Sequence, residues 1–167
     1  MKDTMLDKTK VNLAEVMRGF ATTVSIISTS GHKGGHYAMT ATAVSSVSLD
    51  PESMLVCINK DTLFNSILEE LDKFCINLLA SGQSSQSIDC AGRLPQDNRV
   101  KDTEWEILDD GMAVLKDAQA YVFCRKVKTL EHGSHNIIIG DVYKIILNKA
   151  AEPLLYMDGK YGRFNEI

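Results

Sequence analysis

Apolar and β-branched residues recur along this chain in short runs, and turn-forming residues separate the runs. Runs of this length and composition predict β-strands rather than helices. The predicted strands are 21–30, 36–48, 54–59, 73–80, 118–130, 137–148 and 153–161. The glycine-rich stretch 31–35 is expected to join the first two strands in a hairpin, and the last strand is expected to close the sheet.

Helical spacing of apolar residues is confined to short segments. The predicted helices are 12–19, 63–71 and 83–91. Asn12 is the expected N-cap of the first helix, and either Asp61 or Thr62 can cap the second. The stretch 93–106 is polar and irregular, so it is the best candidate for a mobile loop.

About six or seven strands joined mostly by hairpins, with two or three short helices, indicate a mainly β fold with a closed or sandwiched antiparallel sheet. Strands and helices do not alternate around a G-x-G-x-x-G turn, so a Rossmann domain is not expected. A length of 167 residues suits a single domain over 1–167, in which 1–10 are predicted to form a flexible tail.

Composition excludes several classes of function. A net charge of −4 and a pI near 5.5 give no electrostatic footprint for nucleic acid or an anionic membrane. The chain shows no signal peptide and no apolar run long enough to span a bilayer, so a cytoplasmic location is expected. Motifs of hydrolases and kinases are also absent from the sequence.

The cysteine and histidine patterns do not indicate a metal site. The four cysteines form no CxxC pair and are expected to be reduced structural thiols. The pairs His32/His36 and His132/His135 lack a carboxylate or cysteine placed to complete a ligand set. No bound metal is predicted.

The stretch from Met39 to Pro51 carries no charge until Asp50, and its side chains are nearly all small or β-branched. The overlapping segment 38–43 can present backbone N–H and C=O groups with little bulk over them, because Ala41 and Ala43 do not block an approach. A flat ligand with polar edges, such as a flavin ring, suits this surface. The alternative is a plain edge strand of small residues packed under a helix.

A second candidate site is the turn Asn59-Lys60-Asp61-Thr62, which follows a strand and opens a helix. Backbone N–H groups at a helix N-terminus, with the Thr62 hydroxyl and Lys60 nearby, suit a phosphate. Asp61 is an anion in this turn, so it is expected to cap the helix and to point away from any phosphate. The alternative is an ordinary capped helix.

The segment Thr-Ala-x-Ala-x-Ser-Ser-Val-Ser-Leu-Asp-Pro at 40–51 resembles the signature of the short-chain flavin reductases. Four further pieces resemble the same family in order and spacing. They are 17–24, 74–79, 133–142 and 153–161. Together the similar pieces extend over about residues 12 to 164.

This resemblance implies an FMN-binding split β-barrel that pairs as a homodimer, with the flavin near the subunit interface. It implies an NAD(P)H-dependent flavin oxidoreductase, the reductase component of a two-component flavin monooxygenase. FMN is the expected flavin, with FAD possible, and NADH or NADPH is the expected electron donor. Two alternatives remain: an electron-transfer flavoprotein that holds FMN tightly and does not use NAD(P)H, and a non-catalytic flavin- or haem-binding barrel.

The resemblance also implies roles for particular residues. His135 fills the family's Gly-x-His position on the nicotinamide side of the flavin, with Ser134 where aspartate is usual. The alternative is a solvent-facing histidine in a hairpin. The flavin contacts that the resemblance implies lie at 38–45 and in the turn 59–62, although this turn departs from the family's common Ser-x-Ser-Thr form. They are Ala38, Met39, Thr40, Ala41, Thr42, Ala43, Ser45, Asn59, Lys60 and Thr62.

Overall fold

The computed structural model describes residues 12–31, 34–100, 103–148 and 152–166. The predicted tail 1–10 and His32 lie outside the described residues. The helices are α1 Leu13–Met17, α2 Leu63–Glu70 and α3 Ser84–Ile88, and α3 continues into a π-turn at Asp89–Arg93. A 3₁₀ turn follows at Gln96–Asn98. The strands are β1 Thr22–Thr23, β2 Ser25–Ser30, β3 His36–Ala41, β4 Val44–Leu49, β5 Glu52–Asn59, β6 Lys73–Leu78, β7 Trp105–Ile107, β8 Ala113–Leu115, β9 Ala120–His132, β10 His135–Leu147, β11 Leu155–Met157 and β12 Lys160–Gly162.

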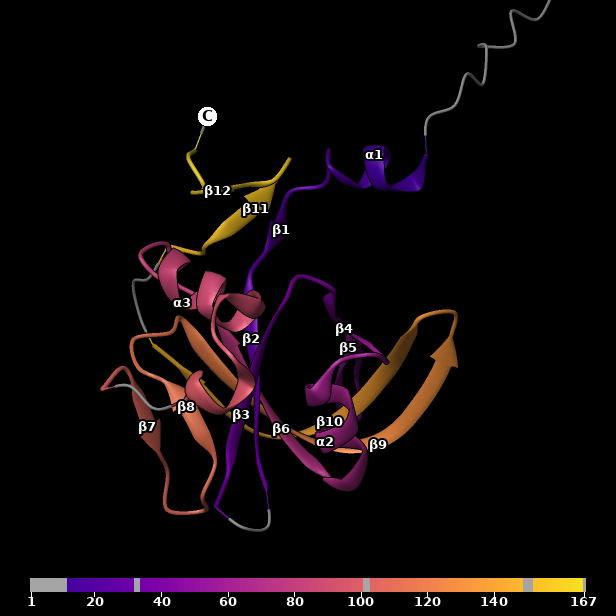
Figure 1. Ribbon diagram of the computed structural model, residues 1–167, viewed down its shortest axis with the longest axis vertical. Coiled ribbons are helices and arrows are strands. Elements are labelled where there is room, and N and C mark those ends of the chain that lie inside the picture. Colours follow the sequence, from indigo (N-terminus) through magenta and orange to yellow (C-terminus); the bar gives the residue numbers. More distant parts are fainter. Residues whose placement is uncertain (1–11, 32–33, 101–102, 149–151, 167) are drawn as a thin grey trace, which may run out of the picture.

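The centre of the molecule is a seven-stranded antiparallel sheet in the order β3-β2-β6-β9-β10-β5-β4. Its two edge strands, β3 and β4, are consecutive in the chain, and only Thr42 and Ala43 connect them. The sheet must therefore curl until its edges approach, as Figure 1 shows. The Cys57 N–H donates to the Ala43 carbonyl, which continues the β4–β5 pairing into the connection. The predicted mainly β, antiparallel split barrel with two or three short helices is confirmed, and the described residues form three.

The prediction of one continuous strand over 36–48 is wrong. The chain leaves the edge of β2 after Ala41 and pairs with β5 from Val44 onward. The alternation of small and hydroxylated side chains continues through this change of partner. A two-residue periodicity indicates an extended backbone, but it does not indicate which strand lies beside it.

The prediction that 153–161 closes the main sheet is also wrong. β11 and β12 pair with β1 in a separate three-stranded sheet. The chain passes from β1 of the small sheet to β2 of the main sheet at Val24, whose N–H donates to the Leu154 carbonyl. Figure 1 shows this small sheet and α1 together at the top of the molecule, away from the barrel.

Several boundaries differ from the predictions by a few residues. α1 ends at Met17 and not at Gly19, and Thr62, not Asp61, caps α2. The β9–β10 hairpin turns on Gly133 and Ser134 alone, where a longer turn over 131–136 was expected. Gly133 has a φ of 55°, a conformation that glycine adopts without steric cost and that a two-residue turn requires.

Buried apolar side chains hold α2 against the barrel. The apolar face predicted for this helix is buried at Phe64 and Leu68, which pack against Phe74 of β6 and Ile58 of β5. On the opposite side of the sheet, the β7–β8 hairpin is held by Asn77, whose Oδ1 accepts from the Leu115 N–H at 2.9 Å. All four cysteines are free thiols.

None of the helices in the described part of the chain has the length and apolar character needed to span a bilayer. Within the same residues, His, Cys, Asp and Glu side chains form no group of three or more that would hold a metal ion.

Candidate functional site

A cavity of about 360 Å³ lies beside β3, and we call it the edge cavity. Three segments line it: β3, the first turn of α2, and the chain that follows α3. The lining residues are Met39, Thr40, Thr62, Leu63, Phe64, Cys90, Ala91, Gln96 and Arg99. The structure therefore brings together three of the predicted site residues, Met39, Thr40 and Thr62.

The open edge of β3 forms one wall of the edge cavity. In the β2–β3 ladder, Ala38 lies opposite Ser28 and Thr40 lies opposite Ile26. The Ala38 carbonyl points away from β2, because it accepts from Gln96 Nε2 and Arg99 Nη1, both at 2.9 Å. Backbone groups two residues apart in a strand point the same way, so the N–H and C=O of Thr40 also face the open edge.

The first turn of α2 supplies backbone donors to the same cavity. The Thr62 hydroxyl donates to the Asn59 carbonyl at 2.8 Å and accepts from the Asn65 N–H at 3.2 Å, so it is already engaged within the turn. The N–H groups of Leu63 and Phe64 have no carbonyl one turn earlier within the helix. These groups and the positive end of the helix dipole favour an anion here.

Arg99 contributes a positive charge to the edge cavity. Its Nε donates to the Leu94 carbonyl at 3.0 Å, and its Nη1 donates to Gln96 Oε1 at 2.7 Å as well as to Ala38. These contacts fix the plane of the guanidinium group. Neither Arg99 nor Gln96 was predicted, because both belong to the polar stretch 93–106 and no local pattern places them against β3. That the stretch is mobile stays a prediction, although these two side chains anchor it to the strand.

The Cys90 side chain forms part of the same wall and is almost fully buried. Burial raises the pKa of its thiol to about 12, so the group is neutral at physiological pH. No carboxylate is among the described residues that line the cavity.

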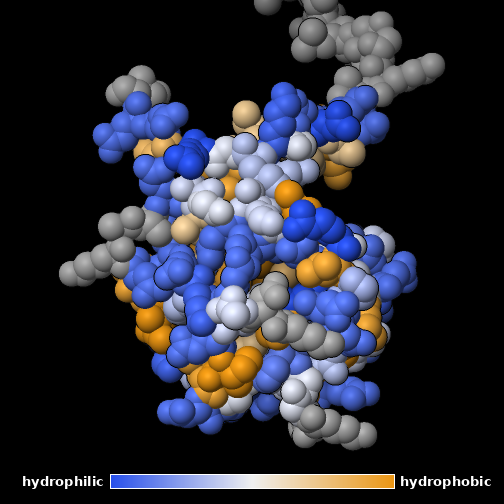
Figure 2. All heavy atoms as spheres, turned by 60° about the vertical axis from the view of Figure 1, so that its left-hand side comes forward, coloured by the Kyte–Doolittle hydropathy of each residue, from blue (hydrophilic) through white to orange (hydrophobic). Residues whose placement is uncertain are grey.

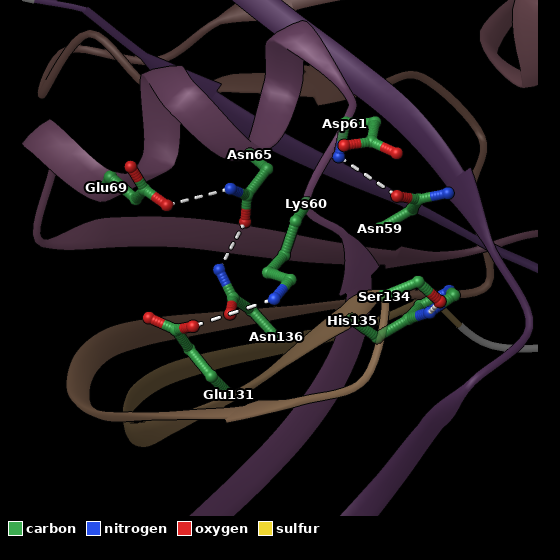
Figure 3. A network of polar contacts seen from close by, with 9 residues as sticks. All are labelled: Asn59, Lys60, Asp61, Asn65, Glu69, Glu131, Ser134, His135 and Asn136. Carbon is green, nitrogen blue, oxygen red and sulfur yellow. Dashed lines mark hydrogen bonds and ion pairs between the residues drawn. The ribbon is translucent and has the colours of Figure 1, made fainter.

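Lys60 does not direct its charge into the edge cavity. Figure 3 shows its side chain extending over Asn136 toward Glu131, and Lys60 Nζ lies 3.6 Å from Glu131 Oε2. Asp61 is exposed, and its N–H donates to Asn59 Oδ1 at 3.0 Å. The expectation that Asp61 caps α2 is therefore wrong, while the expectation that it stays out of the cavity agrees with the lining.

His135 is exposed at the start of β10 and lies opposite Asn59 of β5. Its Nδ1 is 2.9 Å from Ser134 Oγ, and the Lys60 N–H donates to the Ser134 carbonyl at 2.9 Å. The turn that carries His135 is thus attached to the turn that opens α2, and Figure 3 labels residues of both turns.

Comparison with known proteins assigns this arrangement to a family. The flavin reductase like domain matches residues 17–165. The chain belongs to this family. It is 34% identical over 152 residues to the reductase component of the FADH(2)-dependent resorcinol hydroxylase of Rhizobium sp. (strain MTP-10005), covering 90% of this chain and 84% of that protein. It is 32% identical to the FMN reductase (NADH) RutF of Variovorax paradoxus, with 91% and 84% covered.

Solved structures agree in fold. The NADH:FAD oxidoreductase SgcE6 of Streptomyces globisporus C-1027 superposes with a TM-score of 0.84 at 28% identity, covering 93% of this chain and 87% of that chain. The flavin reductase PheA2 superposes with a TM-score of 0.81 at 34% identity, covering 90% and 95%.

The other predicted flavin contacts of this flavin reductase-like chain lie in different surroundings. The Ala38 and Ala41 side chains are buried, and Ala41 pairs with Ser25 in the ladder. Ala43 and Ser45 are exposed on the connection to β4 and on β4 itself. Their flavin contacts stay predictions.

Thr42 lines a second, outer hollow of about 440 Å³ beneath α1. The other lining residues come from α1, β1 and the β11–β12 hairpin with their flanks. They are Ala14, Met17, Arg18, Phe20, Thr22, Tyr156, Met157, Asp158 and Gly159. Thr40 therefore lines the edge cavity, whereas Thr42, two residues later in the predicted flavin-binding segment, lines the outer hollow.

The hydrogen-bonding groups around the edge cavity match those that a flavin nucleotide needs. A phosphate needs hydrogen-bond donors and positive charge, which the first turn of α2 and Arg99 supply. The pyrimidine edge of a flavin ring needs backbone donors and acceptors, which the open edge of β3 presents at Thr40.

Proposed function

We propose that this protein is an NADH-dependent flavin reductase that takes flavin mononucleotide at the open edge of β3. The observation that carries the proposal is the edge cavity, where backbone groups of β3, the first turn of α2 and Arg99 converge in a member of the flavin reductase-like family. Flavin and nicotinamide supply the chemistry: a hydride, carrying two electrons, leaves the nicotinamide C4 and adds to flavin N5.

Each part of the site has a distinct task in this proposal. The N–H and C=O of Thr40 orient the ring edge, while the first turn of α2 and Arg99 hold the phosphate. His135 lies on the nicotinamide side, where its ring can donate a hydrogen bond to the dinucleotide. No general acid or base is required, because the protein's task is to align two rings and exclude water.

The proposal includes a homodimer. None of the residues of α1 is buried, and Leu13 and Phe20 are 76% and 56% exposed. A helix of five residues is marginal in water by itself, even with the Asn12–Glu15 capping box. The face in Figure 2 carries apolar surface in this upper region of the molecule. A second copy packed here would cover α1 and close the outer hollow next to Thr42.

The proposal also includes a partner monooxygenase that receives the reduced flavin. Its support is that one relative is the reductase component of a resorcinol hydroxylase, and that the structurally similar BorF is the flavin reductase component of a bacterial two-component tryptophan halogenase. A single domain over 1–167 and a cytoplasmic location stay predictions.

The decisive experiment is anaerobic reduction. The purified chain is mixed with FMN and then with NADH, and the loss of oxidised flavin absorbance is followed; FAD and NADPH are run in parallel. We expect rapid bleaching with NADH and FMN. Flavin that binds but is bleached only by dithionite would favour the electron-transfer flavoprotein instead, and a chain that binds no flavin would refute both.

A further inference from the structure

Two asparagines are buried together between α2 and β10, and each is only 2% exposed. Asn136 Nδ2 donates to Asn65 Oδ1 at 2.9 Å, and Asn65 Nδ2 donates to Glu69 Oε1 at 2.9 Å. Figure 3 shows this chain of amides below α2, next to the side chain of Lys60. We call the Asn65–Asn136 contact the amide bridge.

Stability alone does not account for the amide bridge. Most side chains that pack between α2 and the sheet are apolar, including Phe64, Leu68 and Ile138. Burying an amide is costly unless its hydrogen bonds are made, and Asn136 Oδ1 has no hydrogen-bond partner among the described residues. An apolar pair of similar size would pack here without that penalty. What two amides add is a fixed distance and direction between the elements that carry them.

Those elements carry the two halves of the proposed site. The backbone N–H of Asn65 is bound by Thr62 Oγ1 at 3.2 Å, so Asn65 belongs to the turn that faces the edge cavity. Asn136 directly follows His135 and pairs with Ile58 and Glu131 in the sheet. The amide bridge thus links the turn proposed to hold the flavin phosphate directly to the hairpin tip proposed to face the nicotinamide.

Hydride transfer depends strongly on how these two sides are spaced. The reacting atoms must approach to about 3–3.5 Å, and a displacement of about 1 Å can cost on the order of a hundredfold in rate. A rotation of α2 or a tilt of the hairpin tip would produce such a displacement without removing any group that touches a substrate.

We propose that Asn65 and Asn136 are positioning residues for hydride transfer, which hold the first turn of α2 and the hairpin tip at the spacing that the reaction needs. This inference rests on the proposed function. It assigns the amide bridge an effect on the rate of transfer rather than on the affinity for either substrate.

The test compares Asn136→Ala, Asn65→Ala and the double variant in anaerobic stopped-flow reduction of bound flavin by NADH. Each single variant should slow hydride transfer by roughly tenfold to a hundredfold, with flavin Kd and NADH KM changed less than about threefold. The double variant should be no slower than the slower single variant, because both substitutions remove the same contact. If the fold-losses in transfer rate of the two single variants multiply in the double variant, the inference is overturned.

A second variant separates positioning from folding. Asn65→Leu combined with Asn136→Leu replaces both amides by apolar groups of similar size and should keep or raise the Tm. We expect this variant to be stable and slow. If it is stable and transfers hydride as fast as the wild type, the amide bridge does not position the reaction.

The matched control is Asn77→Ala, which removes another fully buried asparagine, one that binds Ile26 and Leu115 and not α2 or the hairpin tip. It should lower the Tm while leaving the transfer rate of the folded protein unchanged. A rate loss in Asn77→Ala equal to that in Asn136→Ala would show that loss of stability alone slows the reaction, and would also overturn the inference. If the wild type itself does not oxidise NADH with flavin, the proposed function fails independently of these comparisons.

Discussion

Arg99 offers the sharpest test of where the flavin phosphate binds. Replacing it by alanine removes the positive charge from the edge cavity, while Gln96 Nε2 still donates to the Ala38 carbonyl and keeps that backbone group satisfied. A hydrogen bond to a charged group contributes about 1.5–3 kcal/mol. Arg99 is half-buried, so we expect the lower half of this range, and FMN affinity should fall by roughly tenfold to fiftyfold.

The assay is quenching of flavin fluorescence, titrated with FMN and in parallel with riboflavin, which has the same ring but no phosphate. Arg99→Ala should weaken riboflavin binding less than about twofold, because the lost contact is to the phosphate alone. Arg99→Lys should fall between alanine and the wild type, since it keeps the charge but not the planar group that Gln96 and Leu94 hold.

Lys60→Ala is the matched control for charge. The Lys60 ammonium lies 3.6 Å from Glu131 and does not line the edge cavity, so FMN affinity should change less than about threefold. Equal losses for FMN and riboflavin in Arg99→Ala would refute the phosphate assignment. A large FMN-specific loss in Lys60→Ala, with none in Arg99→Ala, would restore the prediction made from the sequence.

Four further predictions address the ring, the nicotinamide, the assembly and the buried thiol. Ala43→Leu should weaken flavin binding at unchanged Tm because Ala43 is exposed, whereas Ala41→Leu should cost about 1–3 kcal/mol of stability because its side chain is buried; fluorescence titration and thermal unfolding distinguish the two. His135→Ala should raise KM for NADH and lower kcat/KM by roughly tenfold to a hundredfold at unchanged flavin affinity, as steady-state kinetics would show. Phe20→Glu should convert a dimer into a monomer in light scattering, and a wild-type chain that is already monomeric would contradict the proposed assembly. Burial raises the pKa of Cys90 from 9.0 to about 12, so the unfolded chain loses this proton first and the free energy of unfolding falls as pH rises from 9 to 12; Cys90→Ala should remove about 1.4 kcal/mol per pH unit of that slope in urea titrations.

Elements with a local signal were predictable from the sequence. The strand 54–59 is bounded by turn residues, and it is found as β5 at Glu52–Asn59. α2 combines an N-cap threonine with a stripe of apolar residues, and both features depend on neighbours within one or two turns. The switch of partner after Ala41 and the separate sheet of β11 and β12 depend on which distant strand is adjacent, and periodicity carries no information about that.

The same limit explains why the sequence pointed to Lys60 and missed Arg99. Adjacency to a helix N-terminus places the backbone of Lys60 near the proposed phosphate, but its side chain leaves the turn toward the β9–β10 hairpin, where its Nζ lies 3.6 Å from Glu131 Oε2. Arg99 lines the cavity, where its guanidinium binds the Ala38 carbonyl, 61 residues away in the chain. A carbonyl at the edge of a sheet needs a hydrogen-bond donor once another segment of the chain covers it. The segment that covers the Ala38 carbonyl supplies two such donors, Gln96 and Arg99. Which cationic side chain lines the edge cavity therefore depends on the position of the β3 edge in the folded sheet. The spacing of residues around α2 does not determine it.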